Sequence, residues 1–114
     1  MSNILIEVKK MNGIEPEYTH FDSDIIIHIN SALLSLTQLG VGPTNGFMIT
    51  GEAETWDDVL GDSLVFIAAK TFVYLKVRLV FDPPSSSFVI EAMKDQIKEL
   101  EWRLNVQAET TINV

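Results

Sequence analysis

The spacing of apolar residues predicts helices over most of the chain. The first helix is expected to begin with Ser2 or Asn3 as its cap and to end at Gly13, with an apolar face formed by Ile4, Leu5, Val8 and Met11. The second is expected to begin with Asp22 as its cap and to reach Leu39. Strict alternation fails in this segment, whereas a helical period continues through Ile25, Ile29, Ala32, Leu36 and Leu39.

The most apolar stretch, from Leu64 to about Phe81, is predicted to be a core helix capped by Asp62 or Ser63. It is apolar nearly all round, so it should be covered on both sides, by its own domain or by a neighbouring subunit. Three cations interrupt it, and each would cost about 2.5–3.5 kcal/mol at membrane depth. We therefore expect no membrane span here, and the first ten residues lack the cationic leader of a signal peptide.

Asp82-Pro83-Pro84 is predicted to form a short, stiff elbow that sets the angle between two long helices. Two adjacent prolines cannot continue a helix, because each lacks an N–H and restricts the residue before it. The last helix is expected to run from Ser87 to about Val106, with an apolar stripe of Val89, Met93, Ile97, Leu100 and Leu104. Residues 107–114 are predicted to be a flexible C-terminal tail.

Between the second helix and the core helix, Asn45-Gly46 predicts a tight hairpin turn followed by a short strand over residues 47–50. Thr55 is expected to cap a short helix that ends at Gly61. The predicted fold class is therefore all-α: a small bundle of four to five helices with a short hairpin or loop insertion. Residues 1–106 are expected to form a single domain.

The composition narrows the range of functions. With 46% hydrophobic and 21% charged residues, the 114-residue chain has the composition of an ordinary globular protein. It contains no cysteine, which excludes disulfides, thiolate metal sites and cysteine nucleophiles. The whole net charge of −8 lies in residues 1–62, while residues 63–114 are neutral. Such an acidic front half argues against binding of nucleic acid by these residues, because affinity for nucleic acid depends on neutralising its phosphates.

No motif for catalysis or cofactor binding is found. His20 and His28 lack the spacing of a metal site, and the acids at 57, 58 and 62 do not follow a calcium-loop pattern. The glycines at 40, 42 and 46 precede no GK[ST], and the serines at 85–87 are not part of a GxSxG elbow. We therefore expect no enzyme, no cofactor and no bound metal.

Three segments carry a resemblance to a known family: FDSDIIIHINSALLSLTQLGVGP, TWDDVLGD, and KTFVYLKVRLVFDPPSSSFVIEAMKDQIKELEWRLN. They resemble the head–tail connector proteins, also called adaptor or head-completion proteins, of tailed phages and prophages of Gram-positive bacteria. The resemblance covers roughly Ile4 to Gln107, and FDPP followed by ELEWRL is its most distinctive part.

The resemblance implies an all-α structural subunit that assembles as a ring, usually twelvefold, beneath the portal of a filled capsid. Such a ring extends the DNA channel and offers a platform for the next neck or tail-completion protein. It implies a place in the virion neck, with assembly in the host cytoplasm and DNA passing through without specific binding. The alternative function is that of a helical protein–protein adaptor outside a virion.

Two sets of residues are predicted to serve these functions. The expected interface consists of Phe47, Met48 and Ile49 in the loop and Trp102 and Leu104 in the last helix. The acidic cluster of Glu52, Glu54, Asp57 and Asp58 is predicted to line or rim the passage for DNA. The alternative is that these acids only cap helices and keep the subunit soluble.

Overall fold

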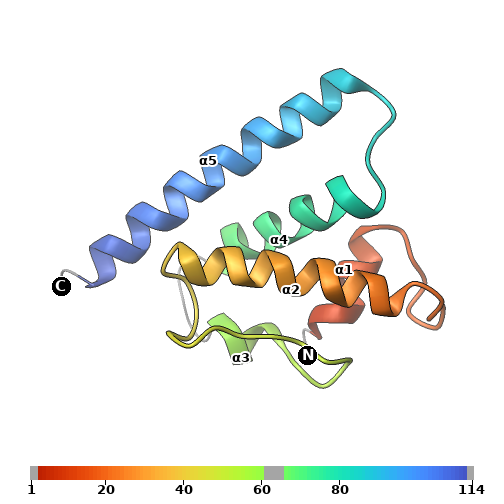
Figure 1. The fold of residues 1–114 in the computed structure, drawn as a ribbon, viewed down its shortest axis with the longest axis horizontal. Coiled ribbons are helices and arrows are strands. Elements are labelled where there is room, and N and C mark those ends of the chain that lie inside the picture. Colours follow the sequence, from red (N-terminus) through yellow and green to blue (C-terminus); the bar gives the residue numbers. More distant parts are fainter. Residues whose placement is uncertain (1–2, 61–65, 113–114) are drawn as a thin grey trace.

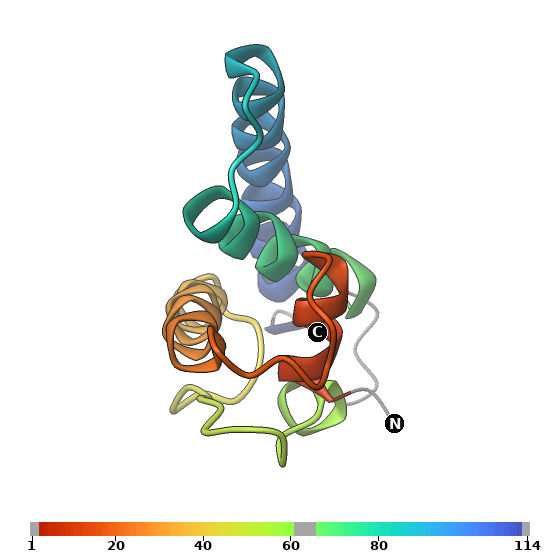
Figure 2. The same cartoon turned by 90° about the vertical axis from the view of Figure 1, so that its right-hand side faces the viewer.

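The computed structural model describes residues 3–60 and 66–112, and this part of the chain is all-helical. The five helices described are α1 (Ile4–Met11), α2 (Asp22–Gln38), α3 (Trp56–Leu60), α4 (Phe66–Phe81) and α5 (Ser87–Ile112). Helix α4 packs against α2 on one side and α5 on the other, while α1 packs against α2 (Figures 1 and 2). The predicted all-α fold is confirmed.

The ends of α1 lie where the sequence predicts them. Asn3 is the cap, and its side-chain oxygen accepts a hydrogen bond from the Ile6 N–H at 3.0 Å. At the other end Gly13 has φ 76°, and the N–H groups of Gly13 and Ile14 donate to the carbonyls of Lys10 and Lys9. This is the Schellman motif, which favours glycine because a side chain is strained at positive φ. Ile4, Leu5 and Val8 are buried as predicted, but Met11 is exposed.

A buried ion pair, which the sequence analysis did not predict, joins α1 to α2. The Lys9 side chain is fully buried; its Nζ lies 2.8 Å from Asp22 Oδ1 and donates to the Pro16 carbonyl at 3.0 Å. The prediction that Asp22 caps α2 is wrong: Phe21 is the N-cap residue and makes no side-chain cap bond. The Asp22 carboxylate instead neutralises an ammonium group that burial would otherwise leave unpaired.

The core is centred on α4. Its Ala69, Phe72, Val73, Leu75 and Val77 are buried. Of the residues predicted to form the inward face of α2, Ile25, Ile29, Ala32 and Leu36 are buried, while Leu39, just past the end of the helix, is partly buried. The α5 stripe is buried only toward the C-terminal end: Ile97 and Leu104 are buried, Met93 and Leu100 partly, while Val89 is exposed. The predicted start of α4 and the expected caps Asp62 and Ser63 lie outside the described residues, as does Gly61.

Helix α5 is longer than predicted, since it continues past Val106 to Ile112. Its C-terminal half is held against the end of α2. Asn105 Nδ2 donates to the Leu39 carbonyl at 3.4 Å, and Gly40 has φ 90°. A Cβ on Gly40 would lie 3.1 Å from Cβ of Ala108, so this glycine permits a close approach. The flexible tail proposed for residues 107–114 stays a prediction.

Residues 41–55 form a loop rather than the predicted hairpin. Gly46 N–H donates to the Pro43 carbonyl at 2.9 Å, which makes a turn, but residues 47–50 form no strand. The prediction of a hairpin and strand is therefore wrong, while the alternative of a loop insertion holds. Because the arm before Asn45 turns away at Gly40 and Gly42, both at φ 90°, it offers no partner strand.

Within residues 3–60 and 66–112, no helix combines the length and hydropathy needed to cross a membrane.

The ion pair between α1 and α2 yields a stability prediction. Asp22→Asn should lower the free energy of unfolding by about 3 kcal/mol, because it leaves the buried Lys9 charge without its counter-ion. The double variant Lys9→Met/Asp22→Asn should recover most of this loss, since it removes both charges. Urea unfolding measures both changes.

Asp24→Asn serves as the matched control, because Asp24 is an exposed acid in the same first turn of α2. It should cost no more than about 1 kcal/mol, the usual contribution of a charge near a helix N-terminus. Equal losses for Asp22→Asn and Asp24→Asn would show that the buried pair has no special role.

Candidate functional site

The three predicted interface residues of the loop lie in different environments. Ile49 is buried, Phe47 is partly buried, and Met48 is 66% exposed. Asn30 on α2 fixes this segment: its Oδ1 accepts from the Ile49 N–H at 2.8 Å and its Nδ2 donates to the Ile49 carbonyl at 3.0 Å. Of these three residues, Met48 presents the most surface to a partner, while Ile49 is part of the core.

An open groove runs between α2 and this loop. Its volume is about 600 Å³, and its lining is Ile27, Asn30, Ser31, Leu34, Thr37, Asn45, Gly46, Phe47 and Met48. Ile27 and Leu34 lie seven residues apart on the outer face of α2, and both are exposed. Sequence reasoning missed them because it followed only the inward face. Two apolar residues at this spacing among His28, Ser31 and Gln38 were a signal for a second apolar face.

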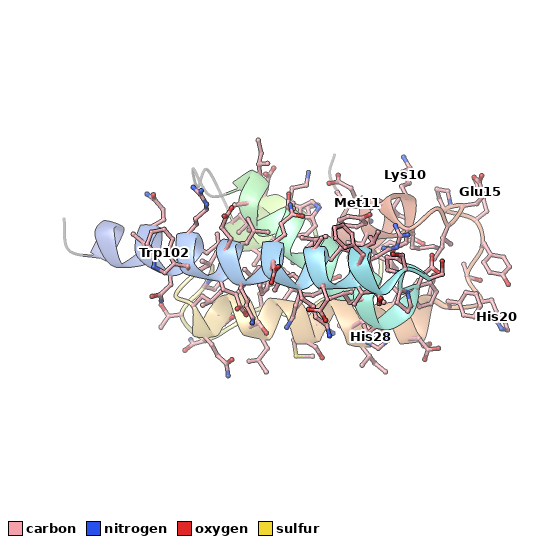
Figure 3. The ribbon with its side chains drawn as sticks, turned by 90° about the horizontal axis from the view of Figure 1, so that it is seen from above. Lys10, Met11, Glu15, His20, His28 and Trp102 are labelled. Carbon is pink, nitrogen blue, oxygen red and sulfur yellow. The ribbon has the colours of Figure 1, made fainter. Side chains whose placement is uncertain are left out.

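The two predicted interface residues of α5 point in opposite directions. Leu104 is fully buried in the core, so it offers no surface to a partner in this conformation. Trp102 is 66% exposed, and Figure 3 shows it on the outer side of α5. An exposed tryptophan is unusual for a monomer and typical of interfaces, so Trp102 stays a predicted contact residue.

Two of the four predicted channel acids use their carboxylates inside the subunit. Asp58 Oδ2 accepts from the Thr55 N–H at 2.9 Å while Thr55 Oγ1 accepts from the Asp58 N–H at 3.4 Å, a capping box at the start of α3. Glu54 Oε2 accepts from the N–H and the hydroxyl of Thr50 at 3.1 and 2.9 Å. Glu52 and Asp57 are exposed.

The hydrogen bonds to Glu54 outweigh the effect of its burial. Desolvation raises the pKa of this carboxyl, but the bonds from the backbone and hydroxyl of Thr50, with smaller help from the Gly51 and Glu54 backbone, hold the pKa below its ordinary 4.5. The charged form of Glu54 therefore stabilises the loop.

At the predicted elbow, side chains from α4 and from Ser86 bond to the backbone at the two flanking helix ends. Arg78 Nε donates to the Asp82 carbonyl at 2.8 Å, just past the C-terminal end of α4, and its Nη1 donates to the Tyr74 hydroxyl at 3.2 Å, which holds the guanidinium in place. Ser86 Oγ accepts from the Val89 N–H at 3.4 Å and caps α5. The intervening residues 82–86 are non-helical, and α5 leaves the elbow at an angle to α4 (Figure 1).

No metal site is assembled in the described part of the chain. His20 and His28 lie apart on the molecule (Figure 3), and no group of three or more potential ligands comes together among the described residues. His20 instead packs edge-on against Phe21, with ring centroids 4.8 Å apart, and Phe21 in turn contacts Phe81.

The comparisons with known proteins identify the family. The family model described as "Phage connector protein" matches residues 4–111. The chain belongs to the phage connector proteins. No match was found among curated proteins or among solved structures. Membership gives the chain a structural, connecting role in a phage. For such a connector the surfaces described above are candidate contacts with other phage components.

The elbow of the connector subunit yields a prediction about shape. Pro83→Ala/Pro84→Ala removes residues that each cost about 3 kcal/mol in a helix interior, so residues 82–86 should gain helix. We expect a folded subunit that shows more helix by circular dichroism. Its assembly into the expected ring should be impaired, because the angle between α4 and α5 changes. Pro43→Ala, in the loop turn, is the control and should assemble normally. Normal assembly of the double variant would refute a role for the elbow.

The Glu54 contact yields a prediction about pH. Since its pKa is lowered on folding, the stability it contributes is present above the ordinary pKa of 4.5 and is lost as the pH falls through the lowered value. Thr50→Val removes the hydroxyl donor and should move the pKa of Glu54 upward, measured by NMR titration of its carboxyl carbon. Thr44→Val, at an exposed threonine of the same loop, should leave it unchanged. Equal titration curves in all three proteins would contradict the assigned cause.

Proposed function

We propose that this connector is a structural subunit of the phage neck that assembles as a ring between the portal and the tail. The family match over residues 4–111 carries the proposal. In such a ring the subunit contacts the portal protein on one side and the next neck or tail-completion protein on the other. Its place is the virion neck, after assembly in the host cytoplasm, and twelve copies match the symmetry usual for such rings.

The distribution of exposed apolar side chains supports an assembled state. Ile27, Leu34 and Met48 are exposed around the groove beside α2, and Phe88 and Trp102 are exposed on α5. Large exposed apolar surfaces on a monomer usually mark sites of interaction. A ring needs two different contact surfaces on each subunit, because each copy meets one neighbour with one face and the other neighbour with another.

The passage of DNA through the ring is consistent with the charge of the chain. The net charge of −8 opposes phosphate binding, so a duplex could slide without being held. The role of the acidic cluster as a channel lining stays a prediction. Within it, Glu54 and Asp58 support the alternative of local capping, since their carboxylates bond to Thr50 and Thr55. Glu52 and Asp57 are the two acids left for a surface role.

The proposed function predicts portal-dependent assembly. The molar mass of the purified protein, measured by light scattering with and without its portal, should rise to a closed multimer in the presence of the portal. The complex should bind no duplex DNA even at low salt, where electrostatic binding is strongest. A protein that stays monomeric with the portal and binds a non-virion partner would instead support an adaptor outside the virion.

A further inference from the structure

A second concave surface lies between α4 and α5, on the side of the molecule away from the loop. This cleft has a volume of about 320 Å³ and is lined by Lys76, Leu79, Val80, Lys94, Ile97, Lys98 and Glu101. We call it the lysine cleft. Its apolar part includes Val80, which is 60% exposed although it lies on the core helix. The lysine cleft therefore combines uncovered apolar surface with a cationic rim.

Three of the eight basic residues of the chain line the lysine cleft, against one acid, Glu101. Lys76 Nζ lies 5.7 Å from the centre of the Phe72 ring, and within the described residues Lys94 makes a long pair with Glu91, at 3.9 Å between two exposed side chains. Exposed pairs of this kind contribute little to stability. Lys94 and Lys98, which are both exposed, thus remain available to an acidic partner.

Residues whose side chains could complement the lysine cleft, one apolar and two acidic, lie on another edge of the subunit. Met48, Glu52 and Asp57 are all exposed on the loop that precedes α3 and on α3 itself. We call these three residues the acidic edge. Figures 1 and 2 both show the loop and α3 on one side of α4 and the elbow end of α5 on the other side. The acidic edge and the lysine cleft therefore cannot meet within one subunit.

We propose that the lysine cleft receives the acidic edge of a second copy of this chain. The side chain of Met48 would cover the apolar surface at Val80, while Glu52 and Asp57 would face Lys94 and Lys98. Both partners in this contact are exposed in the subunit, and their charges are opposite. The flexible methionine side chain suits an irregular apolar surface, and the opposite charges set the register of the two copies.

A second copy fits the lysine cleft better than nucleic acid does. Phosphate backbones favour extended cationic surfaces, whereas this cleft holds Leu79, Val80 and Ile97 beside its lysines, with Glu101 among them. Apolar surface next to cations matches a protein segment that presents an apolar and an acidic side chain together. The front half of this chain, with its net charge of −8, supplies such a segment.

The contact is head-to-tail, because it joins two different surfaces. Repetition of a head-to-tail contact closes into a ring when the rotation between copies allows it, and otherwise gives an open filament. This inference rests on the proposed ring and names the residues that would join neighbouring copies. It also gives Glu52 and Asp57 a role other than the lining of a DNA channel.

Cross-linking tests the contact without background, because the chain has no cysteine. The variant Met48→Cys/Val80→Cys, treated with a short bis-maleimide under conditions in which the wild type assembles, should give a ladder of covalent multimers. Met48→Cys/Ile67→Cys is the matched control, since Ile67 is more exposed than Val80 on the same helix but lies outside the lysine cleft. It should give no ladder.

Charge reversal tests the complementarity. Adding Lys94→Glu/Lys98→Glu to the cross-linking variant should reduce the ladder about tenfold, and adding Glu52→Lys/Asp57→Lys to the same chain should restore it, because opposite charges face each other again. Circular dichroism checks that each variant is folded. An unreduced ladder after the first reversal, or no rescue by the second, would overturn the assigned pairing.

The remaining outcomes separate the contact from the proposed function. If the wild type forms its closed multimer on the portal but the Met48–Val80 pair gives no ladder, the contact is wrong and the ring stands. If no multimer forms at all, the ring and the contact both fail. Duplex DNA binding that disappears with Lys94→Glu/Lys98→Glu would make the lysine cleft a nucleic-acid site and overturn the proposal.

Discussion

The fold depends on the need to cover a helix that is apolar nearly all round. Helix α4 cannot turn one polar face to water, so α2 and α5 must pack on it from two sides. This constraint places α2 and α5, the two longest helices within the described residues, on opposite sides of α4 (Figure 2). The remaining elements fill the space around this arrangement: α1 packs against α2, and Trp56 of α3 is fully buried.

Coverage of α4 is incomplete, and this links the fold to the function. The elbow directs α5 away from α4 at its N-terminal end, which leaves Phe88 83% exposed and opens the lysine cleft between the two helices. A straight continuation of the chain would not produce a cleft there. The same prolines that end α4 therefore leave apolar surface for other molecules, as a connecting protein requires.

Helices could be predicted from the sequence wherever the apolar period is long and the caps are local. Asn3, Gly13 and Thr55 act on residues within a few positions, so their roles could be read from the sequence. Asp22 could not be assigned in this way, because its partner Lys9 lies on another helix. A helix-capping acid and an acid that neutralises a buried lysine look alike until the tertiary contact is known.

The same limit applies to the surfaces. The Asn45-Gly46 pair is typical of a hairpin, yet tertiary bonds from Asn30 determine the path of the chain after it. Leu104 and Trp102 lie two residues apart on one helix, and the helical period places only Leu104 on the apolar stripe. Both were nevertheless assigned to an interface, and the structure shows that Leu104 is core and Trp102 is surface. The lysine cleft draws its residues from two helices, so no spacing in the sequence could reveal it.

The hydrogen bonds made by the Asn30 amide have a consequence for which residues of the loop can be substituted. Its two hydrogen bonds, at 2.8 and 3.0 Å, go to the backbone N–H and carbonyl of Ile49, as one step of an antiparallel ladder would. Hydrogen bonds to the backbone of Ile49 do not depend on which side chain is present at the neighbouring position 48. Residue 48 can therefore change while the loop stays in place, so under the proposed contact the choice of neighbour can diverge at little cost to the fold.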